Sequence, residues 1–137
     1  MGQTNQLRRV MCVEDDADIR MILEFSLGTV GGYEMCLCPG GRSALQQAPQ
    51  FRPDLVLLDV MMPDLSGPET LAAMRQMECM QGVPVVFMTA KAMPDELEAL
   101  LEHGATGLIV KPFDPMTLPR DILPYWEHGR GVQHVPD

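Results

Sequence analysis

Apolar runs that end in polar residues recur along this chain, and this pattern constrains its fold more than any other feature. Four of the runs, at 8–13, 54–58, 83–88 and 105–110, have the length and composition of buried strands. The residues that follow them are, in order, Glu14 with Asp15, Asp59, Thr89 and Lys111. Because the carboxyl ends of parallel strands form one edge of a sheet, where ligands bind, parallel pairing of these runs predicts one small site. That site would hold three carboxylates, a hydroxyl and an ammonium group.

Helix-like segments separate the runs, so strand and helix patterns alternate five times. Asp16 can cap a first helix that stops near Gly28 and the Gly31-Gly32 pair, and a weaker second strand is expected at 33–37. The later helices are expected at 40–48, ahead of Pro49 and Pro53, then at 68–77 and 94–104, and after Asp114-Pro115. Such alternation predicts an α/β fold, with a doubly wound parallel sheet between helices on both faces.

Length and charge restrict the classes of protein to consider. The chain has 137 residues, which is typical of one domain, and its net charge of −9 disfavours nucleic acid and anionic membranes as partners. No apolar segment approaches the length of a membrane span, and the polar N-terminus lacks a signal-peptide core, so we expect a cytoplasmic protein. We expect a flexible N-terminus at 1–7, one module at 8–126 and a disordered tail at 127–137.

The four cysteines do not have the spacing of a zinc ribbon. Cys36 and Cys38 alternate along the expected second strand, so both thiols should lie on one face of the sheet. Reduced, packed cysteines are the favoured interpretation, because disulfides are rare in cytosolic proteins. The competing interpretation, a metal site, lacks enough ligands. The twelve methionines are interpreted chiefly as core fillers, with an adaptable binding surface as the alternative.

The three carboxylates would repel one another strongly in a partly buried cleft. A divalent cation would offset that repulsion, and Mg²⁺ takes one or two carboxylates together with phosphate oxygens. An aspartate carboxylate can attack phosphorus to form an acyl phosphate, a transfer that depends on positioning and charge neutralisation, which Lys111 and Thr89 could supply. Taken singly, Asp15 or Asp16 could instead be a helix N-cap, and Thr89 an ordinary strand-end residue.

The segments 13–16, 57–63, 88–91 and 110–113 read Val-Glu-Asp-Asp, Leu-Leu-Asp-Val-Met-Met-Pro, Met-Thr-Ala-Lys and Val-Lys-Pro-Phe. Together they resemble the motifs of CheY-like receiver domains of response regulators, the phosphoacceptors of two-component signalling, over about residues 8–126. The resemblance implies the flavodoxin-like strand order 2-1-3-4-5. It also implies a stand-alone signalling module, not an enzyme with a separate substrate, that is phosphorylated on Asp59 by a histidine kinase or a histidine phosphotransfer protein.

The resemblance also implies a role for each residue of the predicted site. Mg²⁺ would be held by Asp15, Asp59 and the backbone carbonyl of Met61, with Glu14 reaching the ion through water. Thr89 would be the switch hydroxyl and Lys111 the charge partner of the phosphoryl group. The Lys111–Pro112 peptide bond is a candidate for the cis form.

Three departures from the family pattern lead to expectations of their own. Leu108 stands where the family has a switch aromatic, so we expect activation through displacement of a loop and of the 94–104 helix, without burial of a ring. Met61 and Lys91 border the phosphoryl group and should hinder attacking water, which predicts a long-lived phosphoryl state. Pro119 and Pro124 predict a last helix that is short, kinked or broken between 116 and 126. Many members of the family dimerise through the face formed by the 94–104 helix, the last strand and the last helix. A broken last helix argues against that mode, and a monomer or weak dimer is expected.

Three alternatives remain. A receiver-like adaptor could bind its partners, which the sequence does not identify, without phosphorylation. A flavodoxin would need a phosphate loop and aromatic residues, whereas acids follow the first strand here. A haloacid-dehalogenase-type phosphatase is matched only weakly, by Asp16-Ala17-Asp18, one position late.

Overall fold

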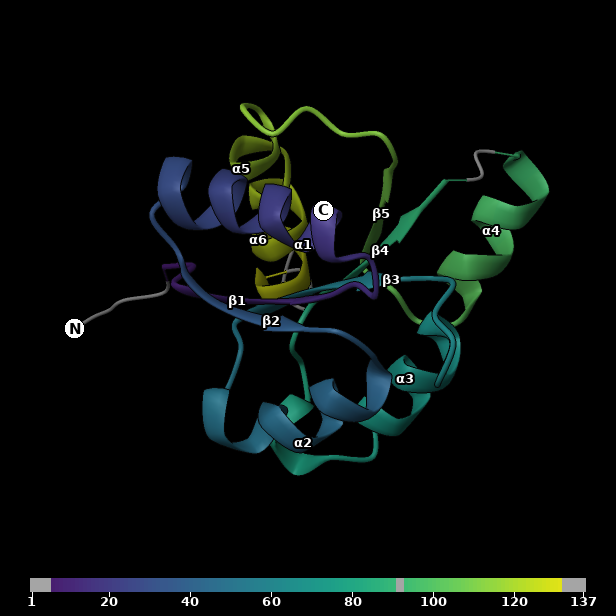
Figure 1. Ribbon diagram of the computed structural model, residues 1–137. Coiled ribbons are helices and arrows are strands. Elements are labelled where there is room, and N and C mark those ends of the chain that lie inside the picture. The colour runs from purple at the N-terminus through teal and green to yellow at the C-terminus, as the bar shows by residue number, and fades with distance from the viewer. Residues whose placement is uncertain (1–5, 91–92, 132–137) are drawn as a thin grey trace.

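A five-stranded parallel sheet lies between two layers of helices (Figure 1). The computed structural model describes residues 6–90 and 93–131. The strand order is β2-β1-β3-β4-β5, so the predicted flavodoxin-like α/β fold is confirmed. The strands are β1 (Arg9–Val13), β2 (Glu34–Cys38), β3 (Leu55–Asp59), β4 (Val85–Thr89) and β5 (Gly107–Val110). The helices are α1 (Ala17–Leu23), the π-helix η1 (Glu24–Val30), α2 (Gly41–Phe51), α3 (Gly67–Met74), the 3₁₀ turn η2 (Glu78–Met80), α4 (Pro94–Glu102), α5 (Leu118–Asp121) and α6 (Leu123–Gly131).

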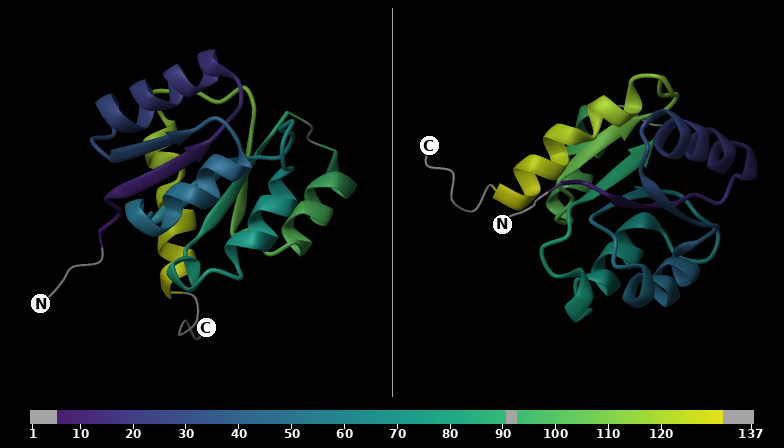
Figure 2. Two further views of the ribbon diagram at one scale, coloured as in Figure 1. Left: turned by 60° about the horizontal axis from the view of Figure 1, so that its bottom comes forward. Right: turned by 90° about the vertical axis from the view of Figure 1, so that its left-hand side faces the viewer.

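The apolar strands of the sheet build a separate core on each of its faces. One core joins alternate strand residues to α1, η1, α5 and α6, and includes Leu57, Leu118 and Trp126. The other joins the remaining strand residues to α2 and α3, and includes Leu58 and Phe87. The views in Figure 2 show helices on both sides of the sheet. Full burial of each such side chain stabilises the fold by about 1.5–3 kcal/mol, and this fixes the strand ends that carry the predicted site.

The methionines divide between core and surface. Met74, Met80 and Met88 are fully buried, whereas Met61 and Met93 are 70% and 64% exposed. The core-filler interpretation is therefore right for the first three and wrong for the other two.

Two expected helix ends are wrong. Pro49 lies inside α2, which was expected to end at residue 48 and continues to Phe51. Burial of Ala44 and Ala48 against the core keeps this stretch helical and outweighs the poor helix propensity of proline. Helix α3 ends at Met74 and not near 77, since Arg75 caps it and a 3₁₀ turn follows at Glu78–Met80.

The last helix is broken, as Pro119 and Pro124 predicted. Four residues form α5, and α6 starts anew after Ile122. The predicted boundary of the tail at residue 127 is wrong, however, because α6 continues to Gly131. The first helix also differs in kind, since it widens into the π-helix η1 before it ends next to Gly31. In η1 the buried Ser26 hydroxyl donates to the Pro115 carbonyl at 2.5 Å, which ties this helix to the loop before α5.

Some expectations concern parts of the chain outside the described residues. These parts are most of the N-terminal segment (1–5), Lys91 and the end of the tail (132–137). Within the described residues, no helix combines the length and apolar character that crossing a membrane requires.

Candidate functional site

Three carboxylates meet at the carboxyl edge of the sheet, as predicted from the strand ends. Glu14 and Asp15 follow β1, and Asp59 is the last residue of β3. One carboxylate oxygen from each lies within 4.8 Å of the other two. Glu14 and Asp59 are 1% and 5% exposed, whereas Asp15 is exposed to solvent. Three acids at this spacing form an oxygen-rich site of high negative charge density, open on the Asp15 side.

Lys111 supplies the positive charge of this edge. Its Nζ lies 3.0 Å from Glu14 Oε1 and 3.1 Å from Asp59 Oδ1, so one ammonium group bridges the two buried acids. The peptide bond from Lys111 to Pro112 is cis, as predicted.

Burial and neighbouring charges shift the pKa values of Glu14, Asp59 and Lys111. Burial raises the pKa of Glu14 and of Asp59, against the lowering effect of their hydrogen bonds to Lys111. Burial acts to lower the pKa of Lys111, but its hydrogen bonds to Glu14 and Asp59 outweigh that effect and raise it. A single ammonium therefore does not fully offset the cost of ionising the two buried carboxylates, and the site favours a further cation.

Local hydrogen bonds fix the loop that follows β1. The Asp16 carboxylate caps α1, accepting from the amides of Asp18 at 2.8 Å and Ile19 at 3.2 Å. Capping therefore falls to Asp16, and Asp15 lies with the acidic group. Arg20, which the sequence did not single out, donates from Nη1 to the carbonyls of Glu14 at 2.8 Å and Asp15 at 3.1 Å. This guanidinium holds the backbone that presents the two acids.

The acidic group opens into a cleft of about 290 Å³ whose lining includes Thr89 and Met61 as well as the three acids and Lys111. Thr89 is the last residue of β4 and is 6% exposed. The structure thus brings together all the residues predicted to bind the metal or the phosphoryl group that it describes. Leu108 does not line the cleft; it packs, half-buried, at the border of the core on the α2 and α3 side. Its carbonyl accepts a hydrogen bond from Tyr125 Oη at 3.2 Å, a contact that the sequence did not indicate.

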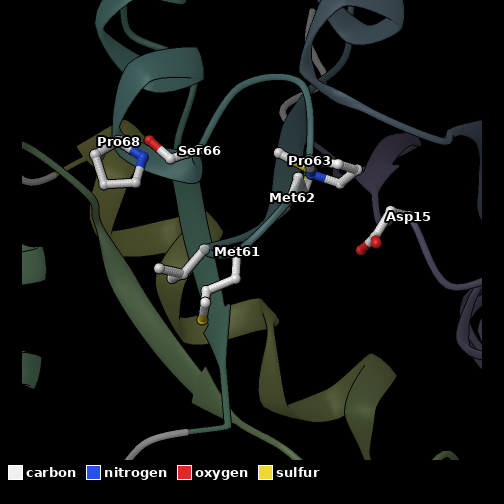
Figure 3. A pocket seen from close by; sticks show the side chains of 7 residues that line it. Asp15, Met61, Met62, Pro63, Ser66 and Pro68 are labelled. Carbon is white, nitrogen blue, oxygen red and sulfur yellow. The ribbon is translucent and has the colours of Figure 1, made fainter.

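A wider recess of about 560 Å³ adjoins the cleft and is lined mainly by the loop after β3. Figure 3 shows the Asp15 carboxylate facing this loop, which carries Met62 and Pro63, with Met61 beside the recess. Because Met61 lines both the cleft and the recess, its long side chain stands at the border between the acidic edge and solvent.

Gly67 closes the same loop against β3. Its amide donates to the Val60 carbonyl at 2.8 Å, and a Cβ on it would lie 2.7 Å from the Asp59 carbonyl oxygen. A Gly67→Ala variant is therefore expected to lose about 2 kcal/mol of unfolding free energy, because backbone atoms must shift to admit the methyl group. Urea unfolding measures this loss. In the control variant Gly28→Ala the new methyl group meets only flexible side chains, so a similar loss there would contradict the steric explanation.

Comparison with known proteins gives consistent matches. The family model described as response regulator receiver domain matches residues 10–122. The transcriptional regulatory protein PrrA of Mycobacterium tuberculosis is 39% identical over 105 residues, which are 77% of this chain and 44% of that protein. The probable transcriptional regulator ycf27 of Pyropia yezoensis is 39% identical over 114 residues, covering 83% of this chain and 45% of that protein. The chain thus spans less than half the length of these relatives.

Solved structures match over nearly the full length of both chains. The chemotaxis response regulator CheY4 of Vibrio cholerae has a TM-score of 0.81 and 32% identity, and the match covers 88% of this chain and 99% of that one. The receiver domain of a sensor histidine kinase from Pseudomonas aeruginosa, solved with a magnesium ion coordinated in its active site cleft, has a TM-score of 0.78 and 27% identity. That match covers 88% of this chain and 98% of that one.

Proposed function

The chain belongs to the response regulator receiver domain family, and we propose that it accepts a phosphoryl group on Asp59 from a histidine kinase or a histidine phosphotransfer protein. The observation that carries the proposal is the bridging of Glu14 and Asp59 by Lys111 beside the exposed Asp15. An acid that serves only structure has no need of two further carboxylates within reach. A phosphoacceptor needs them to bind the metal that accompanies the incoming phosphoryl group.

Mg²⁺ is the proposed cofactor, and the donor set fits it. Asp15, Asp59 and the carbonyl of Met61 would hold the ion directly, and Glu14 would reach it through water. These are oxygen donors, as Mg²⁺ prefers, and the raised pKa values of the buried acids favour a second cation. The magnesium reported in the Pseudomonas aeruginosa receiver domain supports the same assignment. When bound, the ion neutralises charge on the phosphoryl oxygens.

The residues of this chain would then divide the transfer among them. An oxygen of the Asp59 carboxylate attacks phosphorus, the bond from phosphorus to the donor's imidazole nitrogen breaks, and an acyl phosphate forms. Lys111 moves from pairing with the free carboxylate to neutralising a phosphoryl oxygen, and the Thr89 hydroxyl donates to another. The work is positioning and charge stabilisation, which a preorganised site of this kind provides.

Incubation with acetyl phosphate, followed by intact mass measurement, tests the proposal. The protein is expected to gain one phosphoryl group when Mg²⁺ is present and none when the divalent cation is removed by a chelator. No adduct after prolonged incubation with excess Mg²⁺ would favour the alternative, a receiver-like adaptor that binds partners without phosphorylation.

Met61 is proposed to slow the loss of the phosphoryl group. Its side chain is 70% exposed and lines the cleft, where it lies in the path of attacking water. A Met61→Asn variant is expected to lose phosphate several-fold faster, because an amide can orient water and a thioether cannot. The rate is measured as phosphate release from the purified phosphorylated protein. Unchanged release in the variant would remove Met61 from this role, and Lys91 would be the next residue to test.

Helix α4 is proposed to carry the signal to the partner protein. With Leu108 in place of an aromatic ring, movement of Thr89 has no ring to turn inward behind it. Helix α4 follows β4, the strand that ends at Thr89, and contributes no fully buried side chain, so little packing holds it in place. Structures with and without a phosphoryl mimic should therefore differ in the position of α4. That the chain acts as a stand-alone, cytoplasmic regulator that is monomeric or weakly dimeric and binds no nucleic acid stays a prediction.

A further inference from the structure

Two thiols lie together outside the acidic edge, on the face of the outer strand β2 that faces α2. The Sγ atoms of Cys36 and Cys38 are 3.9 Å apart, and both residues belong to or border the core on this side. Cys36 Sγ also contacts Gln47 Oε1 at 3.2 Å, and the Gln47 amide donates to Ser43 Oγ at 3.1 Å. The cluster thus joins β2 to α2 through the side chains of Cys36 and Gln47. Figure 1 shows these two elements side by side.

The separation of the two sulfur atoms suits a shared metal ion better than a disulfide. Two thiolates that lie about 2.3 Å from one three-coordinate ion, at trigonal angles, are about 4.0 Å apart, close to the observed 3.9 Å. A disulfide requires sulfur atoms about 2.05 Å apart and Cα atoms no more than about 6.8 Å apart. Alternate residues of an extended strand are already about 6.4–6.8 Å apart, at the upper end of that range. An ion can therefore bridge the pair with little movement, whereas a disulfide would distort the strand.

The surrounding residues indicate which class of ion fits. Structural Zn²⁺ takes four ligands, but among the residues that the structure describes the acidic group is the only set of three or more candidate ligand residues. Met11 is fully buried and pairs in register with Cys36, so its thioether side chain belongs to the same face. Two thiols and a neighbouring thioether are soft ligands, which select Cu(I) over harder ions.

We propose that Cys36 and Cys38 bind one Cu(I) ion. On binding, both S–H bonds break, two copper–sulfur bonds form, two protons pass to solvent and the copper remains in the cuprous state. Cys36 is partly exposed and gives the ion access, whereas Cys38 is fully buried and keeps water from that side of the ion. Burial raises the pKa of both thiols, that of Cys38 to about 12, so ions that cannot displace a thiol proton should not compete.

The site is chemically independent of the proposed phosphoacceptor. The hydrogen bond from the Glu14 amide to the Cys38 carbonyl, at 2.9 Å, links the two sites and involves only backbone atoms. An Asp59→Asn variant should therefore bind Cu(I) as the parent does, and failure of either proposal leaves the other standing.

An anaerobic competition titration tests the proposal. The fully reduced protein is added to Cu(I) held by the chelator bicinchoninate, and the parent is expected to withdraw one Cu(I) per chain. Cys36→Ser and Cys38→Ser should each weaken the apparent affinity by about 100-fold or more, since even outer-shell partners of a metal site contribute 10–100-fold. The control Cys79→Ser, at a thiol on η2 outside this cluster, should bind as the parent does.

A second measurement on the parent avoids any dependence on variant folding. One equivalent of Cu(I) should protect Cys36 and Cys38 from alkylation, mapped by peptide mass, and leave Cys79 reactive. The proposal is overturned if the parent withdraws no copper, if Cys36→Ser binds as tightly as the parent, or if Cys79 is protected equally. Zn²⁺ binding of the same strength would overturn the assignment to a cuprous ion.

Discussion

An Asp59→Asn variant is expected to take up no phosphoryl group from acetyl phosphate and Mg²⁺, under conditions in which the parent gains one. The asparagine amide keeps the size of the aspartate and a carbonyl oxygen, but it lacks the anionic oxygen that attacks phosphorus. Asp59 is 5% exposed and lies 3.1 Å from Lys111, so the substitution also removes the acid that the ammonium orients. Intact mass reports uptake directly, and the expected effect is complete loss.

The control for this experiment is Asp95→Asn, at an exposed position in the first turn of α4. It removes the same charge from the protein and should leave uptake unchanged. Uptake by Asp59→Asn equal to that of the parent would place the phosphoryl group elsewhere. Glu14 and Asp15 are then the candidates, because their carboxylate oxygens lie within the same 4.8 Å group. Peptide mapping would distinguish them.

Loss of the bridging ammonium is expected to produce the largest change in stability. In a Lys111→Met variant the two buried acids would face each other without their shared partner. Removal of one member of a buried ion pair typically costs 3–5 kcal/mol, and since the Lys111 side chain keeps 17% of its surface exposed, we expect about 3 kcal/mol at pH 7 without divalent cations. Urea unfolding measures this loss, and added Mg²⁺ should restore part of it.

The same variant should show a distinct dependence on pH. The pKa values of Glu14 and Asp59 are raised in the folded protein, so each contributes stability that is present below its unfolded pKa and is lost as pH rises through its folded pKa. Without Lys111, whose hydrogen bonds lower both pKa values, these pKa values rise further. The stability lost between acid and neutral pH is then larger in the variant than in the parent. The difference between parent and variant should therefore be small near the ordinary carboxyl pKa of about 4 and should grow towards pH 7.

Arg120→Met is the matched control for the lysine variant. Arg120 is an exposed cation whose nitrogen lies 3.8 Å from an oxygen of Asp121, and exposed pairs contribute at most about 1 kcal/mol. It should therefore change stability little and without the same pH dependence. If the two variants behaved alike, the effect at Lys111 would reflect the net charge of the protein and not the buried bridge.

The convergence of the site residues could be predicted from the sequence, because it depends only on strand ends. Once the apolar runs are parallel strands, Glu14, Asp59 and Lys111 must lie at one edge, whatever the loops between them do. The Lys111–Pro112 cis peptide could be predicted only through the family resemblance. Local sequence left open whether Asp15 or Asp16 caps the first helix. The hydrogen bonds in the structure show that Asp16 does.

Features that depend on tertiary packing could not be predicted. Arg20 contacts the loop after β1 because one turn of helix brings its guanidinium back to the Glu14 carbonyl, and an arginine on a helix has no sequence signal for that role. Pro49 in α2 contradicts local propensity because the buried alanines beside it favour the helix. The hydrogen bond from Tyr125 to the Leu108 carbonyl depends on the break between α5 and α6, whose position the prolines indicated but whose geometry they did not.

The absence of a fully buried side chain from α4 has a consequence for the cost of moving it. An element that buries little apolar surface can open by itself, at a free energy well below that of global unfolding. Its backbone amides should exchange with deuterium sooner than those of β3 or β4, in which every side chain is buried. A phosphoryl group at the end of the sheet therefore needs only a modest free energy to shift α4 from one position to another. The strands that hold the reacting groups stay in place.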